Sequence, residues 1–120
     1  MQPSMKRPLL RLVQLSSPAI FALSSGEQAV ELLDAPDNLK FRALVTDVNL
    51  GVGKLTGWDV ARRAREVTQD LAIVYMTGDS AGEWASRGVP NSILLTKPFA
   101  PAQLITAVSQ LMNAGIPPTA

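Results

Sequence analysis

Three apolar stretches of the sequence are each followed by a polar side chain that could take part in the chemistry of a phosphoryl group. Asp47 ends the stretch 41–47, Thr77 follows the stretch 71–76, and Lys97 follows the stretch 92–96. A carboxylate can attack phosphorus as a nucleophile, an ammonium group can neutralise phosphoryl oxygens, and a hydroxyl can donate a hydrogen bond to one of them. Together these residue types predict a site for a transferred phosphoryl group, provided that the fold brings them to one place.

The order of the expected elements predicts such a convergence. From residue 18 onward the sequence repeats a short apolar run, a loop and an amphipathic helix, with strands expected at 18–23, 41–47, 71–76 and 92–96. This alternation is typical of a parallel sheet with helices on both faces, and nearly continuous apolar runs are typical of strands buried on both sides. Right-handed crossovers then place the carboxyl ends of the strands at one edge, where ligands of open α/β sheets bind.

The helices are expected at 25–33, at 57–67, in a short segment before Gly88, and within 97–113, where Pro101 suits the first helical turn. Ser25 and Gln28 have the spacing of a capping box at the start of the first helix. Both long helices show an apolar stripe at helical spacing, and arginines 62, 63 and 65 are expected on the solvent-facing side of the second helix. The residues expected to be buried are Val60, Ala61, Ala64 and Val67 in one stripe, and Leu104, Ile105, Val108, Leu111 and Met112 in the other.

The N-terminal segment does not fit the repeat. Residues 1–17 contain one apolar run, Pro8 to Leu15, which could form a strand or a helix but not a strand followed by a helix. A five-unit sandwich would then have a missing or degraded first strand, with a gap or an open edge in the sheet. The expected division is therefore an atypical segment 1–17, a core domain 18–113 and a loose tail 114–120.

Composition excludes several classes of function. The 120 residues include no cysteine and no histidine, which excludes disulfides, thiolate metal sites, imidazole catalysis and ordinary zinc sites. The formal net charge of +1 gives no electrostatic case for binding nucleic acid or an anionic membrane. There is no apolar run of membrane-spanning length and no signal-peptide pattern, so a cytoplasmic location is expected.

Three blocks of the sequence, "LVTDVNLG…GW", "VYMTG" and "LLTKPF", together resemble the receiver domains of bacterial response regulators. The resemblance covers residues 18–113 and implies a flavodoxin-like, doubly wound parallel sheet. It also implies that Asp47 is the phosphoacceptor, Thr77 the switch hydroxyl and Lys97 the invariant lysine of the family. By the same resemblance, Asp47 and the backbone carbonyl of Asn49 would bind Mg²⁺. Lys97 precedes Pro98, so its peptide bond could be cis.

The sequence departs from the family pattern at two places. Met5, Lys6 and Arg7 stand where receivers carry an acidic pair that helps to hold Mg²⁺, and a site with one carboxylate suits that cation poorly. Leu94 stands where many receivers carry an aromatic switch residue. We therefore expect a weak Mg²⁺ site and no signal transmission by rotation of an aromatic ring.

The resulting hypothesis is a stand-alone receiver domain, rather than an enzyme, that accepts a phosphoryl group on Asp47 in a two-component phosphorelay. Its expected donor is a histidine kinase or a phosphotransfer protein, and its output is contact with another protein, with no nucleic acid and no membrane involved. The alternative is a degenerate receiver that binds proteins independently of phosphorylation. A nucleotide-binding loop is a further class, but Gly51-Val52-Gly53-Lys54 fits neither the dinucleotide fingerprint nor the P-loop.

Three explanations of the unusual N-terminus remain open at this stage. The recorded start could lie too far downstream, the domain could be naturally degenerate, or the missing strand could come from a second copy of the chain. The last explanation predicts a homodimer, because pairing of strands between copies is a low-cost route to one.

Overall fold

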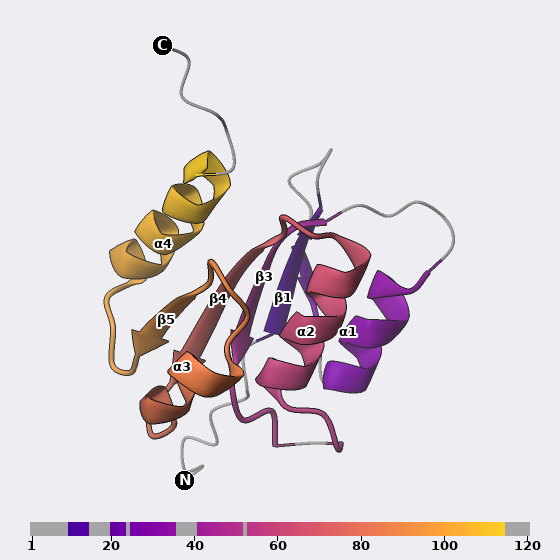
Figure 1. Ribbon diagram of the computed structural model, residues 1–120, viewed down its shortest axis with the longest axis horizontal. Helices are drawn as coiled ribbons and strands as arrows, with labels where there is room; N and C mark the ends of the chain where they lie inside the picture. The colour runs from indigo at the N-terminus through magenta and orange to yellow at the C-terminus, as the bar shows by residue number, and fades with distance from the viewer. Residues whose placement is uncertain (1–9, 15–19, 24, 36–40, 52, 115–120) are drawn as a thin grey trace, which may run out of the picture.

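A five-stranded sheet with helices on both faces forms the protein (Figure 1). The structure is a computed structural model, which describes residues 10–14, 20–23, 25–35, 41–51 and 53–114. The strands lie in the order β2-β1-β3-β4-β5 across the sheet. They are β1 (Leu10–Gln14), β2 (Ile20–Ala22), β3 (Phe41–Asp47), β4 (Ala72–Thr77) and β5 (Ile93–Thr96).

The helices begin and end close to where the sequence predicts them. They are α1 (Gly26–Leu33), α2 (Gly57–Val67), the short pair η1 (Ala81–Glu83) and α3 (Trp84–Arg87), and α4 (Pro101–Ala114). Ser25 caps α1, because its side chain accepts a hydrogen bond from the backbone N–H of Gln28 at 3.2 Å. Pro101 is the first residue of α4, where its missing N–H costs no hydrogen bond.

Strands β3, β4 and β5 form the parallel part of the sheet. Asp47 pairs with Met76, and Thr77 pairs with Thr96, so the three strands end at the same edge. All six residues of β4 are buried, as expected for a central parallel strand that is covered on both faces. This register brings the residues that follow the three strands together.

Strand β1 lies between β2 and β3 and runs antiparallel to both, with Leu10 opposite Thr46. The α/β sandwich with an atypical first strand is therefore confirmed, but the expectation of a wholly parallel sheet is wrong. The connection from β1 to β2 spans only residues 15–19, whereas a parallel pair needs a crossover of a dozen or more residues. A short connection can join neighbouring strands only as a hairpin.

Each face of the sheet has its own apolar core. Helices α1 and α2 lie side by side over one face (Figure 1), and the core there contains Leu10, Leu12, Leu44, Ile73 and Tyr75 of the sheet with Ala29, Leu33, Trp58, Val60, Ala61 and Ala64 of the helices. On the other face α4 packs through Ala107 against Val45, Val74 and Met76. Two residues of the predicted stripes are instead exposed, Val67 at 45% and Ile105 at 67%, because the sheet covers only part of each helix.

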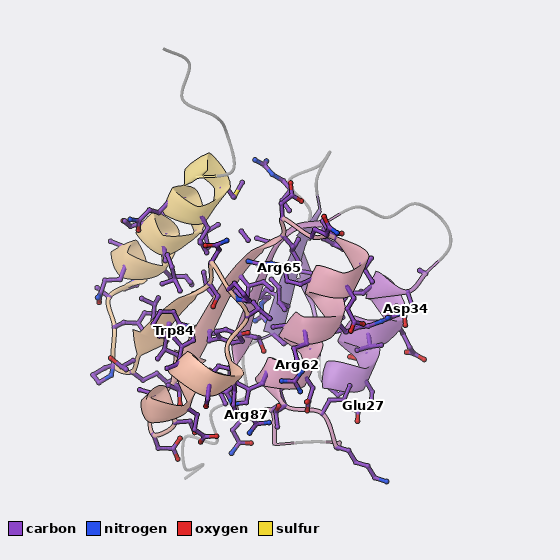
Figure 2. All side chains as sticks on the ribbon, viewed as in Figure 1. Glu27, Asp34, Arg62, Arg65, Trp84 and Arg87 are labelled. Atoms are coloured by element: carbon purple, nitrogen blue, oxygen red, sulfur yellow. The ribbon has the colours of Figure 1, made fainter. Side chains whose placement is uncertain are left out.

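Arg65 differs from the expectation of a solvated helix face. It is partly buried, whereas the other two arginines of α2 are exposed. Its guanidinium donates hydrogen bonds to the carbonyl oxygens of Leu71, Pro90 and Asn91 at 2.8, 2.6 and 3.1 Å. Figure 2 labels the Arg65 side chain beside α2. Burial lowers the pKa of Arg65 below its usual value. Arg65 therefore fastens α2 to the loops that precede β4 and β5.

The described helices include none with both the length and the apolar composition that a membrane span requires.

Candidate functional site

Asp47 and Lys97 meet at the carboxyl edge of the parallel strands. The Lys97 Nζ lies 2.7 Å from Oδ1 of Asp47. The Asp47 side chain is 8% exposed and the Lys97 side chain is 39% exposed, so the carboxylate is enclosed while the ammonium group reaches solvent. They line a pocket of about 310 Å³ together with Asn49, Met76, Thr77, Gly78 and Asp79. The structure thus brings the three polar residues singled out in the sequence to one pocket.

Backbone hydrogen bonds beyond the strand ends hold these residues together. The N–H of Val48 donates to the carbonyl of Met76 at 3.0 Å, directly after Asp47. The N–H of Lys97 donates to the carbonyl of Thr77 at 2.8 Å. The parallel pairing therefore continues to the residues that carry the chemistry, and it positions them through the backbone.

Gly57 allows α2 to begin directly against Asp47. Its N–H donates to the carbonyl of Val48 at 2.7 Å, and a Cβ on residue 57 would lie 2.2 Å from the carbonyl oxygen of Asp47. A side chain cannot fit at that distance, so only glycine permits this approach. Gly57 was not among the site residues expected from the sequence. The sequence feature that could have identified Gly57 is a glycine at the first position of a helix, directly after Thr56, which caps that helix.

Thr77 is buried, and its hydroxyl oxygen accepts hydrogen bonds from the backbone N–H groups of Asp79 at 3.2 Å and Ser80 at 2.9 Å. The same oxygen lies 3.5 Å from Oδ1 of Asp79, to which it donates. Thr77 therefore lies at the pocket as predicted, while its hydroxyl is engaged by the loop that follows it.

The loop after β3 forms the outer wall of the pocket. The Asn49 side chain accepts a hydrogen bond from the N–H of Gly51 at 3.0 Å, and Gly51 and Gly53 have positive φ angles of 74° and 78°. Glu27 of α1 accepts a hydrogen bond from the N–H of Lys54 at 2.8 Å, and this bond lowers the pKa of Glu27 below its usual value. Glu27, which the sequence analysis did not single out, thus links α1 to the loop.

The residues that the structure describes do not fit a resident Mg²⁺ ion. In that part of the chain there is no group of three acidic or other metal-ligating side chains that could hold a metal. Oδ1 of Asp47 is paired with Lys97, and Mg²⁺ requires near-octahedral oxygen coordination. Met5, Lys6 and Arg7, which replace the acidic pair of the family, lie outside the described residues. The weak Mg²⁺ site expected from the sequence stays a prediction.

Two further expectations concern the last strand. The Lys97–Pro98 peptide bond is cis, as the sequence allowed. Leu94 is partly buried and packs against the core on the α1 and α2 face. An aliphatic side chain thus occupies the position at which, by the family resemblance, many receivers carry an aromatic switch residue.

Comparison with known proteins gives a clear relationship. No protein-family model and no curated protein matches the sequence. Among solved structures, a response regulator receiver protein from Sinorhizobium medicae is 51% identical, with a TM-score of 0.68, over 75% of this chain and 70% of that protein. The chain belongs to the response-regulator receiver family. Its expected membership, drawn from the Asp47, Thr77 and Lys97 blocks, is confirmed.

More distant structures share the receiver fold. The receiver domain of a sensor histidine kinase from Pseudomonas aeruginosa, which has a magnesium ion coordinated in its active-site cleft, matches with 23% identity and a TM-score of 0.59 over 76% of this receiver and 74% of that chain. NtrX from Brucella abortus matches with 21% identity and a TM-score of 0.57 over 72% of this receiver and 20% of that chain. At these identities the likeness extends to the fold alone.

Proposed function

We propose that this receiver accepts a phosphoryl group on Asp47 from a histidine kinase or a phosphotransfer protein. One observation carries the proposal: a buried carboxylate is paired at 2.7 Å with Lys97 in a pocket that Thr77 also lines. Family membership supports the same reading, because the paired residues are those that the family resemblance assigns to this chemistry. The domain would act as a signalling acceptor rather than as an enzyme with a separate substrate.

The proposed reaction is an in-line transfer. A carboxylate oxygen of Asp47 attacks phosphorus, a new P–O bond forms, and the P–N bond of the donor phosphohistidine breaks with its electron pair remaining on the ring nitrogen. The Lys97 ammonium lies 2.7 Å from Oδ1 of Asp47, where it can neutralise charge that develops on the phosphoryl oxygens. The Thr77 hydroxyl would then donate a hydrogen bond to one of those oxygens.

Intact mass after incubation with acetyl phosphate tests the acceptor. We expect a gain of one phosphoryl group in the wild type, measured with and without added Mg²⁺, and no gain in Asp47→Asn. Asp70→Asn is the matched control, because Asp70 is an exposed carboxylate that lines a separate pocket with Arg65 and Leu71. It should gain the same mass as the wild type.

A folded wild-type protein that gains no mass under any of these conditions would contradict phosphoryl transfer. That result would favour the alternative from the sequence, a degenerate receiver that binds proteins independently of phosphorylation. The loss of Asp47 would then leave partner binding unchanged.

The output of this receiver, its location in the cell and its oligomeric state stay predictions. Contact with a downstream protein is the proposed output, since the net charge of +1 favours no nucleic acid partner. The cytoplasmic location and the homodimer expected from the sequence are likewise untested.

A further inference from the structure

The hydroxyl of Thr77 is held in place by the loop that follows it. Two backbone N–H groups, those of Asp79 and Ser80, donate to its oxygen at 3.2 and 2.9 Å. Oδ1 of Asp79, 3.5 Å from this oxygen, is the acceptor for the hydroxyl hydrogen and makes the longest of the three contacts. A hydroxyl has one hydrogen to donate, so Thr77 cannot donate to Asp79 and to a phosphoryl oxygen at the same time.

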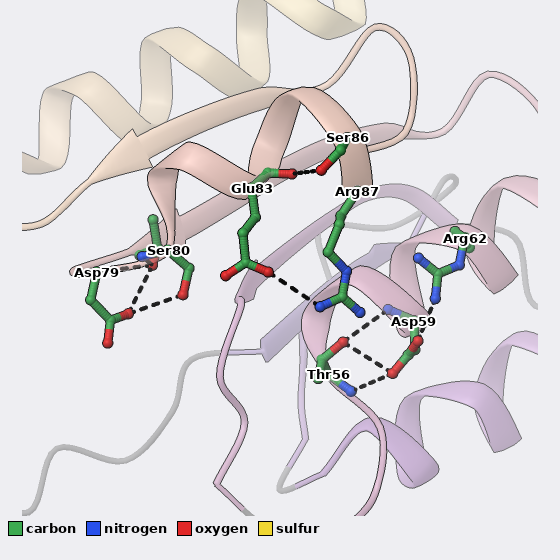
Figure 3. Close-up of polar contacts among 9 residues, drawn as sticks. Thr56, Asp59, Arg62, Asp79, Ser80, Glu83, Ser86 and Arg87 are labelled. Carbon is green, nitrogen blue, oxygen red and sulfur yellow. Dashed lines mark hydrogen bonds and ion pairs between the residues drawn. The ribbon is translucent and has the colours of Figure 1, made fainter.

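The Asp79 carboxylate is in turn held by Ser80. The Ser80 hydroxyl donates to the same Oδ1 of Asp79 at 3.1 Å, and Figure 3 shows the two side chains pointing toward one another. Asp79, Ser80 and the hydroxyl of Thr77 thus form a closed set of short-range hydrogen bonds. This arrangement gives the Thr77 hydroxyl an acceptor in Oδ1 of Asp79.

Asp79 also shares the pocket with Asp47. Both residues line it, and Asp79 is exposed whereas Asp47 is buried. Gly78, between Thr77 and Asp79, has nothing within 4 Å of the position of a Cβ. A side chain at residue 78 would therefore meet open space, while the carbonyl of Thr77 at the end of β4 accepts a hydrogen bond from the Lys97 N–H.

We propose that Asp79 is a positioning residue that holds the Thr77 hydroxyl before phosphoryl transfer and is expelled by the phosphoryl group once it is on Asp47. The inference rests on the proposed function of Asp47. Phosphorylation replaces the single negative charge of the Asp47 carboxylate by a charge of about −1.5 to −2 on the aspartyl phosphate, so the pocket that Asp79 shares becomes more negative. Like charges in one pocket repel, so Asp79 moves away and the Thr77 hydrogen is released to the phosphoryl oxygen.

Two substitutions separate the charge of Asp79 from its hydrogen bonds. Asp79→Asn keeps an oxygen that accepts from Thr77 and Ser80 but removes the charge, whereas Asp79→Ala removes both. Because Asp79 is exposed, both variants should fold, which urea unfolding checks. Glu83→Gln is the matched control, since Glu83 lies in the same segment but pairs with Arg87 at 3.3 Å (Figure 3).

The first readout is amide hydrogen exchange of Ser80 in the unphosphorylated protein. The Ser80 N–H donates to the Thr77 hydroxyl oxygen, which Asp79→Ala leaves without the acceptor that orients it. We therefore expect exchange to rise about tenfold in Asp79→Ala and to stay within about twofold of wild type in Asp79→Asn and Glu83→Gln. Unchanged exchange in Asp79→Ala would overturn the proposal, even in a protein that accepts phosphate on Asp47.

The second readout uses beryllofluoride, an anion that mimics a phosphoryl group on a carboxylate. In wild type its binding should speed Ser80 exchange, whereas Asp79→Asn should bind it about fivefold more tightly with a smaller change in exchange. An Asp79→Asn protein identical to wild type would mean that Asp79 only shapes the loop. If wild type binds no beryllofluoride and gains no mass with acetyl phosphate, both charge-driven release and the proposed function of Asp47 fail.

Discussion

Asp47 carries its negative charge where water has little access. Its side chain is 8% exposed, and burying a carboxylate costs free energy unless a charge or hydrogen bonds compensate it. Lys97 supplies a compensating charge at 2.7 Å and is itself partly in solvent. In the proposed phosphoryl transfer, such a pair would combine an enclosed acceptor with a cation that stabilises charge on the phosphoryl oxygens.

The contact between Gly57 and Asp47 gives a prediction at the residue scale. In Gly57→Ala the new Cβ would meet the Asp47 carbonyl oxygen at 2.2 Å, so the start of α2 must move. We expect a loss of about 1–3 kcal/mol in the free energy of unfolding, measured in urea, and slower phosphorylation of Asp47.

Gly82→Ala is the matched control for this prediction. Nothing lies within 4 Å of a Cβ at residue 82, so this variant should be as stable as wild type or slightly more stable. Equal stability of Gly57→Ala and wild type would show that the close approach at residue 57 is not required.

At the scale of the element, α2 owes its sharp start to a reciprocal cap. The Thr56 N–H donates to Oδ2 of Asp59 at 2.8 Å, and the Asp59 N–H donates to the Thr56 hydroxyl oxygen at 3.3 Å. Asp59 also pairs with Arg62, one turn along the helix. The cap fixes where α2 begins and so where Gly57 meets the end of β3.

The charge of Asp59 predicts a dependence of stability on pH. The hydrogen bond from the Thr56 N–H lowers the pKa of Asp59 below its usual value, with burial acting in the opposite direction. A carboxylate with a lowered folded-state pKa stabilises the protein above its unfolded-state pKa of about 4, and the contribution is lost as pH falls through the folded-state pKa.

Comparison with Asp59→Asn measures this contribution. Wild type should exceed the variant in free energy of unfolding at a pH of about 5.5, and the difference should shrink as the pH approaches about 3. Urea unfolding at several pH values provides the measurement. A difference that stays constant with pH would show that the carboxylate charge of Asp59 contributes nothing to the cap.

At the scale of the whole molecule, β1 completes the sheet between β2 and β3. Leu10 and Leu12 are 1% and 0% exposed, and both belong to the core beneath α1 and α2. The position that the sequence left as a gap or an open edge is thus filled by a strand of the same chain. A second copy of the chain is therefore not needed to supply this strand, and the homodimer stays a prediction.

Leu12→Ala tests whether β1 is integral to the fold. Removing a fully buried leucine side chain should lower the free energy of unfolding by about 2–5 kcal/mol. Ile105→Ala is the matched control, because Ile105 is 67% exposed on α4 and should change stability by no more than about 0.5 kcal/mol. Equal effects of the two substitutions in urea unfolding would contradict the position of β1 in the core.

The sequence by itself determined most of the elements and placed Asp47, Thr77 and Lys97 at one edge of the sheet. Strand β3 and helix α2 have the predicted bounds, because apolar runs and capping residues are local signals. Asp47, Thr77 and Lys97 could be selected because parallel strands share one carboxyl edge, so their order along the chain implies convergence.

Only the tertiary structure decided the direction of β1, the inward turn of Arg65 and the engagement of Thr77 by Asp79. The run Pro8 to Leu15 fits a helix or a strand locally, and pairing with β3 selected the strand. Periodicity placed Arg65 on the outer face of α2, yet its long side chain reaches carbonyl groups of distant loops. Such contacts depend on which segments become neighbours in space, and local patterns in the sequence do not carry that information.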